Sequence, residues 1–282
     1  MRHTRRSIPP DGPKTMPFQA LRRRQADASI DHTELERAAG LLRDAKRVLV
    51  ITGAGMSADS GLPTYRGIGG LYDTDRTEEG VAIEDALSGA MFERDPALTW
   101  KYIAQIESAC RGAAPNRGHA VLAEWASRFE RLCVLTQNVD GFHRIAGSDD
   151  VIEMHGNIHG LSCVACRHRT RVDDYAGLGA LPPRCEICGG VLRPDVVLFG
   201  EMLPARAVTR YERALSDGFD VVMSIGTTAV FPYIAAPVRE AWQSGYGTIE
   251  INPQPTDISR FCHAIMRAPA ARVLERLSER IG

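Results

Sequence analysis

Four cysteines form two pairs whose spacing is typical of a metal site. Cys163 and Cys166 are followed, after 18 intervening residues, by Cys185 and Cys188. Two Cys-x-x-Cys pairs at this separation match the four-thiolate sites that hold zinc in tetrahedral geometry. Because four protein ligands leave no open position for a substrate, the pattern predicts one structural Zn²⁺ per chain. Two redox dithiols or a pair of disulfides are the alternative interpretations.

A glycine-rich loop follows the first buried strand that we expect. Gly53, Ala54, Gly55 and Ala58 fit the pattern Gly-x-Gly-x-x-Ala. Glycines there let the backbone approach a pyrophosphate, whose charge the next helix N-terminus favours. Dehydrogenases add an acidic residue at the end of a second strand, about 20 residues on. Residues 69–79 contain acids but no strand. We therefore expect a dinucleotide bound in another manner, with a phosphate-free turn as the alternative.

Polar side chains follow three further expected strands. Ligands of open parallel sheets bind beyond the carboxyl ends of the strands, where such side chains could hold ribose and phosphate oxygens. Helix capping is the alternative for each of them. The groups are Thr136-Gln137-Asn138-Val139-Asp140, Gly226-Thr227-Thr228 and Asn252.

One histidine is placed for proton transfer. His155 follows the short apolar segment 151–154 and precedes Gly156, which lets another group come close to the ring. The ordinary pKa of histidine suits a general base near neutral pH. A structural histidine is the alternative, and His143 and His159 are competing candidates for the base.

These residues must be positioned by strands that alternate with helices. Continuous apolar runs separated by helical patterns are typical of an α/β fold, with a mainly parallel sheet covered on both faces. The expected strands are 47–52, 131–136, 195–199, 220–225 and 248–251. The expected helices are 35–45, 116–129, 204–216, 233–244 and 268–280.

Two stretches interrupt this alternation and predict a second, smaller domain. Residues 67–115 look helical, and residues 156–193 are rich in Cys, Gly, Arg and Pro, as a zinc-binding insert would be. The large domain would comprise residues 35–66, 116–155 and 194–282. Residues 1–34 predict a basic flexible leader, with seven Lys and Arg among the first 30 residues. A targeting peptide or a basic docking arm is the alternative.

Composition excludes several classes of protein. The chain has 282 residues, with 34 Lys and Arg against 35 Asp and Glu, so a generally basic nucleic-acid binder is not expected. The apolar runs are much shorter than a membrane-spanning helix needs. Thiols with metal-site spacing indicate a reducing compartment, and we expect a cytoplasmic protein. Arginine greatly outnumbers lysine, a bias that suggests a GC-rich, bacterial genome.

Taken in order, the motifs resemble those of the sirtuin family of NAD-dependent protein deacylases, over about residues 40–275. The resemblance implies a Rossmann-like large domain and a small domain made of a zinc module and a helical module. NAD, consumed as a co-substrate, and an acyl-lysine protein substrate would enter the cleft from opposite sides. The motifs lie at 53–61, 63–66, 136–141, 155–156, the two Cys pairs, 199–201, 226–228 and 251–252.

The resemblance also implies a reaction and a role for individual residues. The acyl oxygen would attack C1′ of the nicotinamide ribose as nicotinamide leaves. His155, the general base, would then activate a ribose hydroxyl, which attacks the imidate carbon and leads to free lysine and O-acyl-ADP-ribose. Asn138 would orient ribose and water. The peptide would pair as a strand beside residues 197–201.

By the same resemblance, the NAD contacts are Gly53, Ala54, Gly55, Ala58, Thr64, Tyr65, Arg66, Gln137, Asn138, Asp140, Gly226, Thr227, Thr228 and Asn252. The peptide contacts are Val197, Phe199, Gly200 and Glu201.

The sequence departs from the family pattern at two places. Thr64 and Tyr65 stand where Asp and Phe are commoner. Family members that remove succinyl and malonyl groups carry a Tyr-x-x-Arg pair, and here those positions are Ile103 and Ile106. Apolar side chains cannot pair with a distal carboxylate, so we expect neutral acyl groups to be preferred and succinyl-lysine to be a weak substrate.

Three other functions are alternatives to deacylation. Mono-ADP-ribosyl transfer to protein would use the same NAD site. A non-catalytic NAD-binding or zinc-interaction module is a second rival, and a dehydrogenase is a third. His155 favours deacylation over the transferase, and His155 together with Asn138 favours it over the non-catalytic module. The missing acidic strand end disfavours the dehydrogenase.

Overall fold

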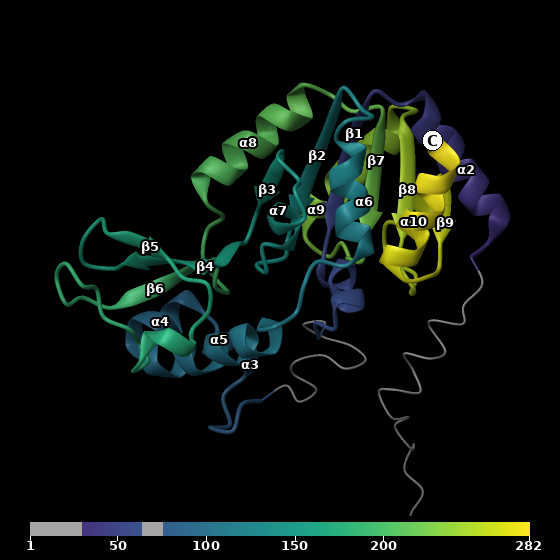
Figure 1. Cartoon of the computed structure of the whole chain (residues 1–282). Coiled ribbons are helices and arrows are strands. Elements are labelled where there is room, and N and C mark those ends of the chain that lie inside the picture. The colour runs from purple at the N-terminus through teal and green to yellow at the C-terminus, as the bar shows by residue number, and fades with distance from the viewer. Residues whose placement is uncertain (1–29, 64–75) are drawn as a thin grey trace, which may run out of the picture.

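The large sheet contains six parallel strands in the order β3-β2-β1-β7-β8-β9 (Figure 1). The computed structural model describes residues 30–63 and 76–282. This strand order is that of a two-halved Rossmann sheet, with its switch point between β1 and β7. The predicted α/β, Rossmann-like fold class is thus confirmed. The strands are β1 Arg47–Thr52, β2 Arg131–Thr136, β3 Val151–Glu153, β7 Val221–Ile225, β8 Gly247–Ile251 and β9 Ala264–Met266.

The central strands are buried on both faces, as continuous apolar runs predict. β1 and β2 have the predicted bounds, and five of the six residues of each are buried. β7 and β8 each begin one residue from the predicted start. β9 was not predicted, because a three-residue edge strand carries too little periodicity to be recognised.

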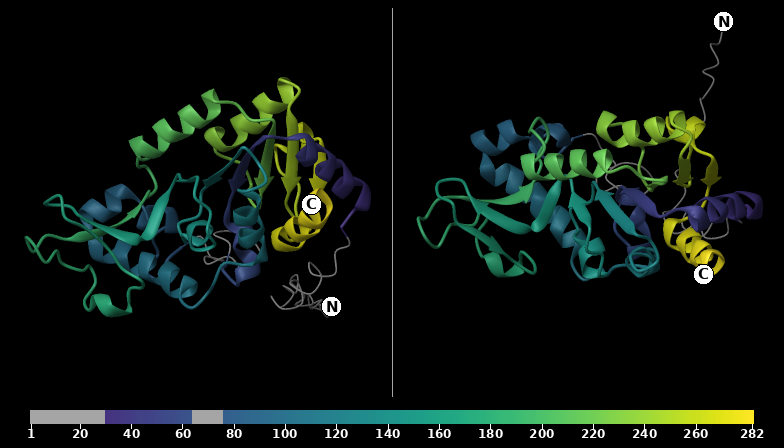
Figure 2. Two further views of the ribbon diagram at one scale, coloured as in Figure 1. Left: turned by 45° about the horizontal axis from the view of Figure 1, so that its top comes forward. Right: turned by 90° about the horizontal axis from the view of Figure 1, so that it is seen from above.

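Helices cover both faces of this sheet (Figure 2, right). One face is covered by α2 (His32–Asp44), α6 (Arg117–Trp125) and α10 (Ala270–Ile281), and the other by α8 (Ala205–Ser216) and α9 (Pro232–Gln243). Capping explains where two of these helices begin. Asp31 accepts from the backbone N–H of Thr33 at 2.8 Å, and Asn116 accepts from Gly118 N at 2.9 Å.

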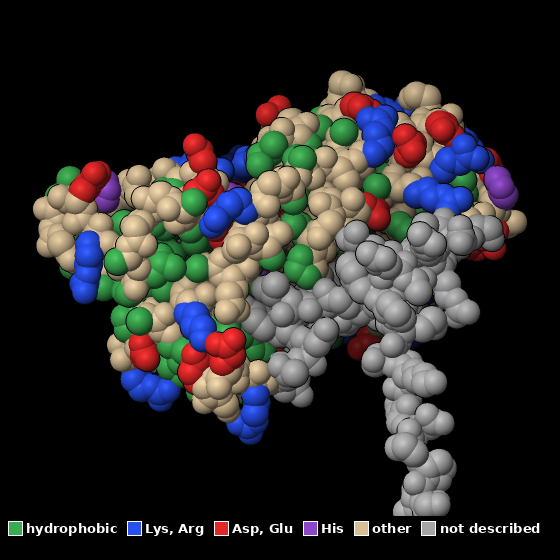
Figure 3. All heavy atoms as spheres, turned by 60° about the horizontal axis from the view of Figure 1, so that its bottom comes forward, with side chains coloured by type: hydrophobic (Ala, Val, Ile, Leu, Met, Phe, Trp, Pro, Cys, Tyr) green, Lys and Arg blue, Asp and Glu red, His purple; other side chains and the backbone are tan. Residues whose placement is uncertain are grey.

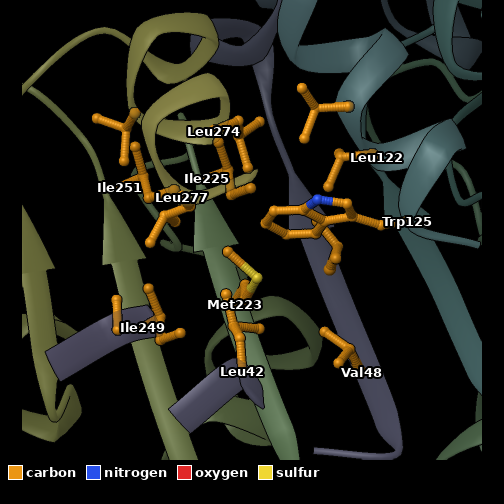
Figure 4. Close-up of a cluster of buried hydrophobic side chains, with 14 of the residues drawn as sticks. Leu42, Val48, Leu122, Trp125, Met223, Ile225, Ile249, Ile251, Leu274 and Leu277 are labelled. Carbon is orange, nitrogen blue, oxygen red and sulfur yellow. The ribbon is translucent and has the colours of Figure 1, made fainter. Parts of the chain in front are cut away.

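Alternation along the strands sends side chains into two separate cores. On one face, Val48 and Met223 of the sheet pack with Leu42 of α2, Trp125 of α6 and Leu277 of α10 (Figure 4). On the other face, Leu49 and Val222 contribute to the core beneath α8 and α9. The sheet is therefore held from both sides, and the loops at its carboxyl edge start from fixed points.

A smaller layer is built from the two inserts. It contains the helices α3 (Ile83–Ala86), α4 (Gly89–Arg94) and α5 (Pro96–Cys110), and an antiparallel sheet in the order β5-β4-β6. The strands are β4 Gly156–Cys163, β5 Arg169–Arg171 and β6 Leu192–Val196. Trp100 and Ile103 of α5 share one core with Leu161 of β4, and Trp100 Nε1 donates to the Leu192 carbonyl at 2.9 Å. The helical and cysteine-bearing inserts thus pack as one unit.

The prediction of a strand at 195–199 in the parallel sheet is wrong. The strand lies at Leu192–Val196 and pairs antiparallel with β4 in the small sheet, not with the parallel sheet. The apolar run misled the prediction because it continues as a loop, in which Leu198 enters the small core. Periodicity reveals a strand but not its partner.

Within the described residues, none of the helices has the length and apolar character needed to cross a membrane. On the face shown in Figure 3, basic and acidic side chains of the described residues are interspersed.

Candidate active site and metal centre

Two glycine loops meet at the switch point of the large sheet. Gly53 N donates to the Ile225 carbonyl at 3.1 Å, and Gly55 N donates to the Gly226 carbonyl at 2.8 Å. A Cβ on Gly55 would lie 2.6 Å from Gly226 Cα. Gly226 itself has φ +60°, and a Cβ there would lie 2.4 Å from Met56 N. These glycines are therefore required for contact between the two backbones, at the edge where doubly wound sheets bind ligands.

The glycine loop continues as two 3₁₀ turns rather than as an α-helix. Ala54 begins the first turn, which ends at Met56, and Ala58 begins the second, which ends at Ser60. The predicted strand, glycine loop and helical turn therefore follow one another as expected. Thr64, Tyr65 and Arg66 lie outside the described residues.

Amide side chains connect three strand ends into one polar cluster. Gln137, after β2, donates through Nε2 to Thr227 Oγ1 at 2.7 Å. Asn252, after β8, donates through Nδ2 to the Thr227 carbonyl at 2.8 Å. Thr228, next along the chain, is exposed. The structure thus brings Gln137, Thr227 and Asn252 together although 115 positions separate the first and last of them.

Asn138 and Asp140 join this cluster to the glycine loop through Ser57. Asn138 Nδ2 donates to the Gly53 carbonyl at 3.0 Å and to Ser57 Oγ at 3.2 Å. Ser57 Oγ donates to Asp140 Oδ2 at 2.7 Å, and Phe142 N donates to Oδ1 at 2.9 Å. Burial raises the pKa of Asp140, and these two donors oppose the shift. Sequence reasoning did not single out Ser57. Its position inside the glycine loop is the feature that could have identified it as a site residue.

His155 lies between β3 and β4 and faces a phenol. Its Nε2 atom is 2.5 Å from the hydroxyl of Tyr233, the second residue of α9. Burial lowers the pKa of His155 below its usual range, and a hydrogen bond with the backbone of Gln137 partly offsets that shift. The imidazole is therefore neutral at physiological pH and able to accept a proton. Tyr233 was missed because it follows the Gly226 motif and carries no spacing signal.

Gly156 explains how His155 is held. Gly156 has φ +83°, and a Cβ there would lie 1.9 Å from the Asp195 carbonyl oxygen. β4 and β6 pair at this point, with Gly156 opposite Val196. The carbonyl of His155 accepts from Val197 N at 2.9 Å. The histidine is thus fixed where the large sheet meets the small one.

The competing histidines have other surroundings. His143 is buried, and its Nε2 contacts Thr52 Oγ1 at 3.0 Å. Burial lowers its pKa to about 3. His159 lies on β4, and its carbonyl accepts from Val172 N. Among the hydrogen bonds of the described residues, neither ring contacts Tyr233, and His143 is a buried core side chain.

The four predicted cysteines come together in one cluster. Their Sγ atoms all lie within 4.8 Å of one another, with Cys163 and Cys188 3.4 Å apart and Cys166 and Cys185 3.8 Å apart. Zn–S bonds of about 2.3 Å place tetrahedral sulfurs about 3.8 Å apart, so the four thiols fit this metal. A Cβ on Gly190 would lie 3.2 Å from Cys163 Sγ and 3.3 Å from Cys188 Sγ, so a glycine leaves room for the cluster.

The predicted peptide-binding segment is partly paired within the chain. Phe199 N donates to the Leu87 carbonyl at 2.9 Å, and Gly89 N donates to the Phe199 carbonyl at 3.0 Å. Glu201 accepts from both terminal nitrogens of Arg193, at 2.8 and 2.9 Å. The backbone of Phe199 and the carboxylate of Glu201 are therefore occupied within the chain. The Phe199 side chain and Met202 remain exposed beside Gly200.

Comparisons with known proteins agree with this geometry. Residues 53–232 match the model of the Sir2 family. The chain is 50% identical over 252 residues to NAD-dependent protein deacylase 2 of Pseudomonas aeruginosa, covering 89% of this chain and 98% of that protein.

Two solved structures are also similar. One is a Sir2 homologue in complex with NAD, with a TM-score of 0.77, 33% identity, and 87% of this chain and 93% of that chain covered. The other is a complex of Sir2 with a p53 peptide and NAD⁺, with a TM-score of 0.74, 26% identity, and 87% and 97% covered. The protein described here therefore belongs to the Sir2 family.

Proposed function

We propose that this protein is an NAD-dependent protein-lysine deacylase. It would consume NAD and an acyl-lysine protein and release nicotinamide, O-acyl-ADP-ribose and free lysine. The observation that carries the proposal is a neutral, half-buried His155 beside the amide and hydroxyl cluster at the switch point. NAD supplies a ribose carbon that becomes electrophilic as nicotinamide leaves.

Each residue of the proposed site has a separate role, which follows from its position. His155 accepts the proton of a ribose hydroxyl through Nε2. Asn138 is already oriented by the Gly53 carbonyl and Ser57, so its amide oxygen is directed by a fixed side chain. Gln137 and Thr227 hold each other beside the ribose site, and Asn252 fixes the Thr227 backbone for the adenosine end. Preorganised groups of this kind lose little entropy on binding.

The end of β2 supports cleavage of NAD rather than hydride transfer. β2 lies next to β1 in the sheet, the place from which dehydrogenases of this fold present an acid to the ribose. Here β2 ends at Thr136 and continues as Gln137-Asn138. Glu79 is one of the acidic residues at 69–79, where a dehydrogenase would have its acid. Its carboxylate is bound by Lys101 and Tyr102 in the small domain.

Acylated proteins are the proposed substrates. Apolar side chains are exposed on two loops beside the site, namely Phe199 and Met202 before α8 and Val230 and Phe231 before α9. These four side chains suit the apolar parts of an extended peptide. The relative bound to a p53 peptide supports the same class of substrate. We also propose a cytoplasmic location, because four thiols with metal-site spacing are typical of a reducing compartment.

A comparison of three proteins tests the proposal. Wild type, His155→Ala and His32→Ala would each receive NAD with acetyl-, butyryl-, long-acyl- or succinyl-lysine peptides. His32 is exposed at the start of α2 and serves as the matched control. We expect peptide-dependent nicotinamide release by wild type and His32→Ala, and a loss of about 10²–10⁴-fold in His155→Ala. Labelling of a protein by ADP-ribose without acyl dependence would support the transferase instead.

A further inference from the structure

The ring of His155 and the phenol of Tyr233 form a pair that has no part in the reaction as proposed above. His155 Nε2 and Tyr233 Oη lie 2.5 Å apart. Nε2 is the atom that the proposed function requires to accept a proton. In the free enzyme this atom is therefore already hydrogen-bonded to the Tyr233 hydroxyl.

The two partners of the His155 ring fix its tautomer. The hydrogen bond with the Gln137 backbone raises the pKa of His155, so it favours the protonated ring. A ring N–H that donates to the Gln137 carbonyl has that effect. Because Nε2 faces Tyr233, we assign the contact with the Gln137 backbone to Nδ1. With the proton on Nδ1, Nε2 would carry the lone pair, and the Tyr233 hydroxyl would donate to it.

Tyr233 remains a donor across the physiological range. Burial raises the pKa of its phenol to about 12, so the hydroxyl stays protonated. The neighbouring titratable group is Tyr211 of α8, whose hydroxyl donates to the Tyr233 carbonyl at 2.7 Å. Glu240 of α9 acts on the pKa of Tyr211, and Glu153 before His155 is bound by Arg144 and Asn157. Within the described chain, burial and the Gln137 backbone shift the pKa of His155, and no carboxylate contributes.

The phenol is held from two sides. Tyr211 fixes the backbone of Tyr233 at the first turn of α9. The ring of Phe231 stacks on that of Tyr233, with centroids 5.6 Å apart and planes 20° apart. The same Phe231 ring meets His155 edge-on at 5.9 Å. The three rings therefore form one packed group, in which the hydroxyl has a defined place.

We propose that Tyr233 is a positioning residue for the general base. Its hydroxyl donates to Nε2 of His155 in the free enzyme and selects the tautomer with the proton on Nδ1. A ribose hydroxyl then replaces the phenol at Nε2 and transfers its proton there, giving an imidazolium whose Nδ1–H remains on the Gln137 carbonyl. This replacement rests on the proposed deacylase function, whereas the pairing in the free enzyme does not.

The pairing has a measurable consequence for His155. A donor to Nε2 stabilises the neutral ring, so its removal raises the pKa of His155. One net hydrogen bond corresponds to a shift of about 0.5–1 pH unit. Well below that pKa, the neutral fraction and the rate would fall about three- to tenfold. At pH 8.5, where the ring is neutral in both proteins, kcat would change little.

The variants Tyr233→Phe and Tyr246→Phe test the proposal. Tyr246 is half-exposed before β8 and serves as the control. Titration of ¹³C-labelled histidine followed by NMR, with His155→Ala to assign the signal, reports the pKa without any turnover. We expect an upward shift of about 0.5–1 unit in Tyr233→Phe alone, with the acid limb of kcat/KM for NAD moving by the same amount. Saturation with ADP-ribose should reduce the difference between wild type and Tyr233→Phe.

The outcomes separate this inference from the proposed function. An unchanged His155 pKa in a folded Tyr233→Phe protein, with an unmoved acid limb, would overturn the pairing even if the enzyme deacylates peptides. A pKa difference that ADP-ribose leaves undiminished would overturn the replacement. A shifted pKa in a protein that does not deacylate would support the pairing and reject the proposed function.

Discussion

Asn138 donates through Nδ2 to the carbonyl of Gly53, 3.0 Å away, and so ties the end of β2 to the glycine loop after β1. The bond crosses between neighbouring strands at the carboxyl edge of the sheet. It holds the proposed ribose-orienting amide against the loop that we expect to contact the phosphates of NAD. A change at Asn138 should therefore affect both the orientation of the ribose and the loop that contacts the phosphates.

Replacing this amide should impair catalysis far more than stability. In Asn138→Ala the Gly53 carbonyl and Ser57 lose a donor, which costs about 1 kcal/mol of unfolding free energy. Loss of the oriented group should lower kcat/KM about 10²-fold. Urea unfolding and initial rates would be compared with Gln243→Ala, a change at an exposed position at the end of α9. Equal rates in the two variants would contradict the role given to Asn138.

Close packing at Gly226 should be visible in a comparison of two glycines with similar backbones. Gly226 and Gly245 have φ values of +60° and +78°. A Cβ on Gly226 would lie 2.4 Å from Met56 N, whereas nothing lies within 4 Å of one on Gly245. Both alanine variants bear the left-handed cost of about 1–2 kcal/mol. Gly226→Ala should also displace the glycine loop, lower Tm further and abolish NAD binding measured by calorimetry, unlike Gly245→Ala.

Metal content should follow the cysteine cluster. We expect about one zinc per chain in wild type and in Cys110→Ser, and none in Cys166→Ser, measured by elemental analysis. Because Cys163 and Cys185 belong to the small-domain core, zinc removal should expose the amides of α5 and β4 to hydrogen exchange. Stoichiometric zinc in Cys166→Ser, or unchanged exchange after chelation, would contradict a structural site.

Two buried histidines should make the fold sensitive to mild acid. Burial lowers the pKa of His143 to about 3 and that of His119 to about 4, below the value of about 6.5 in an unfolded chain. From pH 6.5 down to about 4, the unfolded chain therefore binds protons that the folded chain does not. The free energy of unfolding should fall with decreasing pH by up to about 1.4 kcal/mol per unit for each histidine.

Urea unfolding at pH 7, 6 and 5 measures this slope. His143→Gln should make the slope less steep, because only His119 then contributes, and His32→Gln, at an exposed position, should leave it unchanged. A wild-type stability that is the same at pH 7 and pH 5 would contradict this explanation.

Acyl preference should follow the two isoleucines of α5. Ile103 is buried in the small-domain core and Ile106 packs against that core, so neither position offers a cation to a distal carboxylate. We expect kcat/KM for a succinyl-lysine peptide to be about 10²-fold or more below that for an acetyl or butyryl peptide of the same sequence. Comparable rates would show that another part of the chain recognises the carboxylate.

The sequence was most informative where a single residue type or a single hydrophobic period is enough to identify a structural element or a site. Continuous apolar runs located β1 and β2, and paired cysteines located the metal centre. Sequence could not assign β6 to its sheet, because Leu192–Val196 is chosen by pairing with β4. It also missed Tyr233 and Ser57, whose places in the site depend on contacts across the fold. Such contacts leave no local periodicity.

Product analysis tests the central claim most directly. The protein would be incubated with NAD and an acetyl-lysine peptide, and the products quantified by mass spectrometry against a reaction without peptide. The proposed function predicts nicotinamide, deacetylated peptide and O-acetyl-ADP-ribose in equal amounts, and no nicotinamide above background when the peptide is omitted. Nicotinamide release that does not depend on the acetyl-lysine peptide, with ADP-ribose attached to protein, would contradict it.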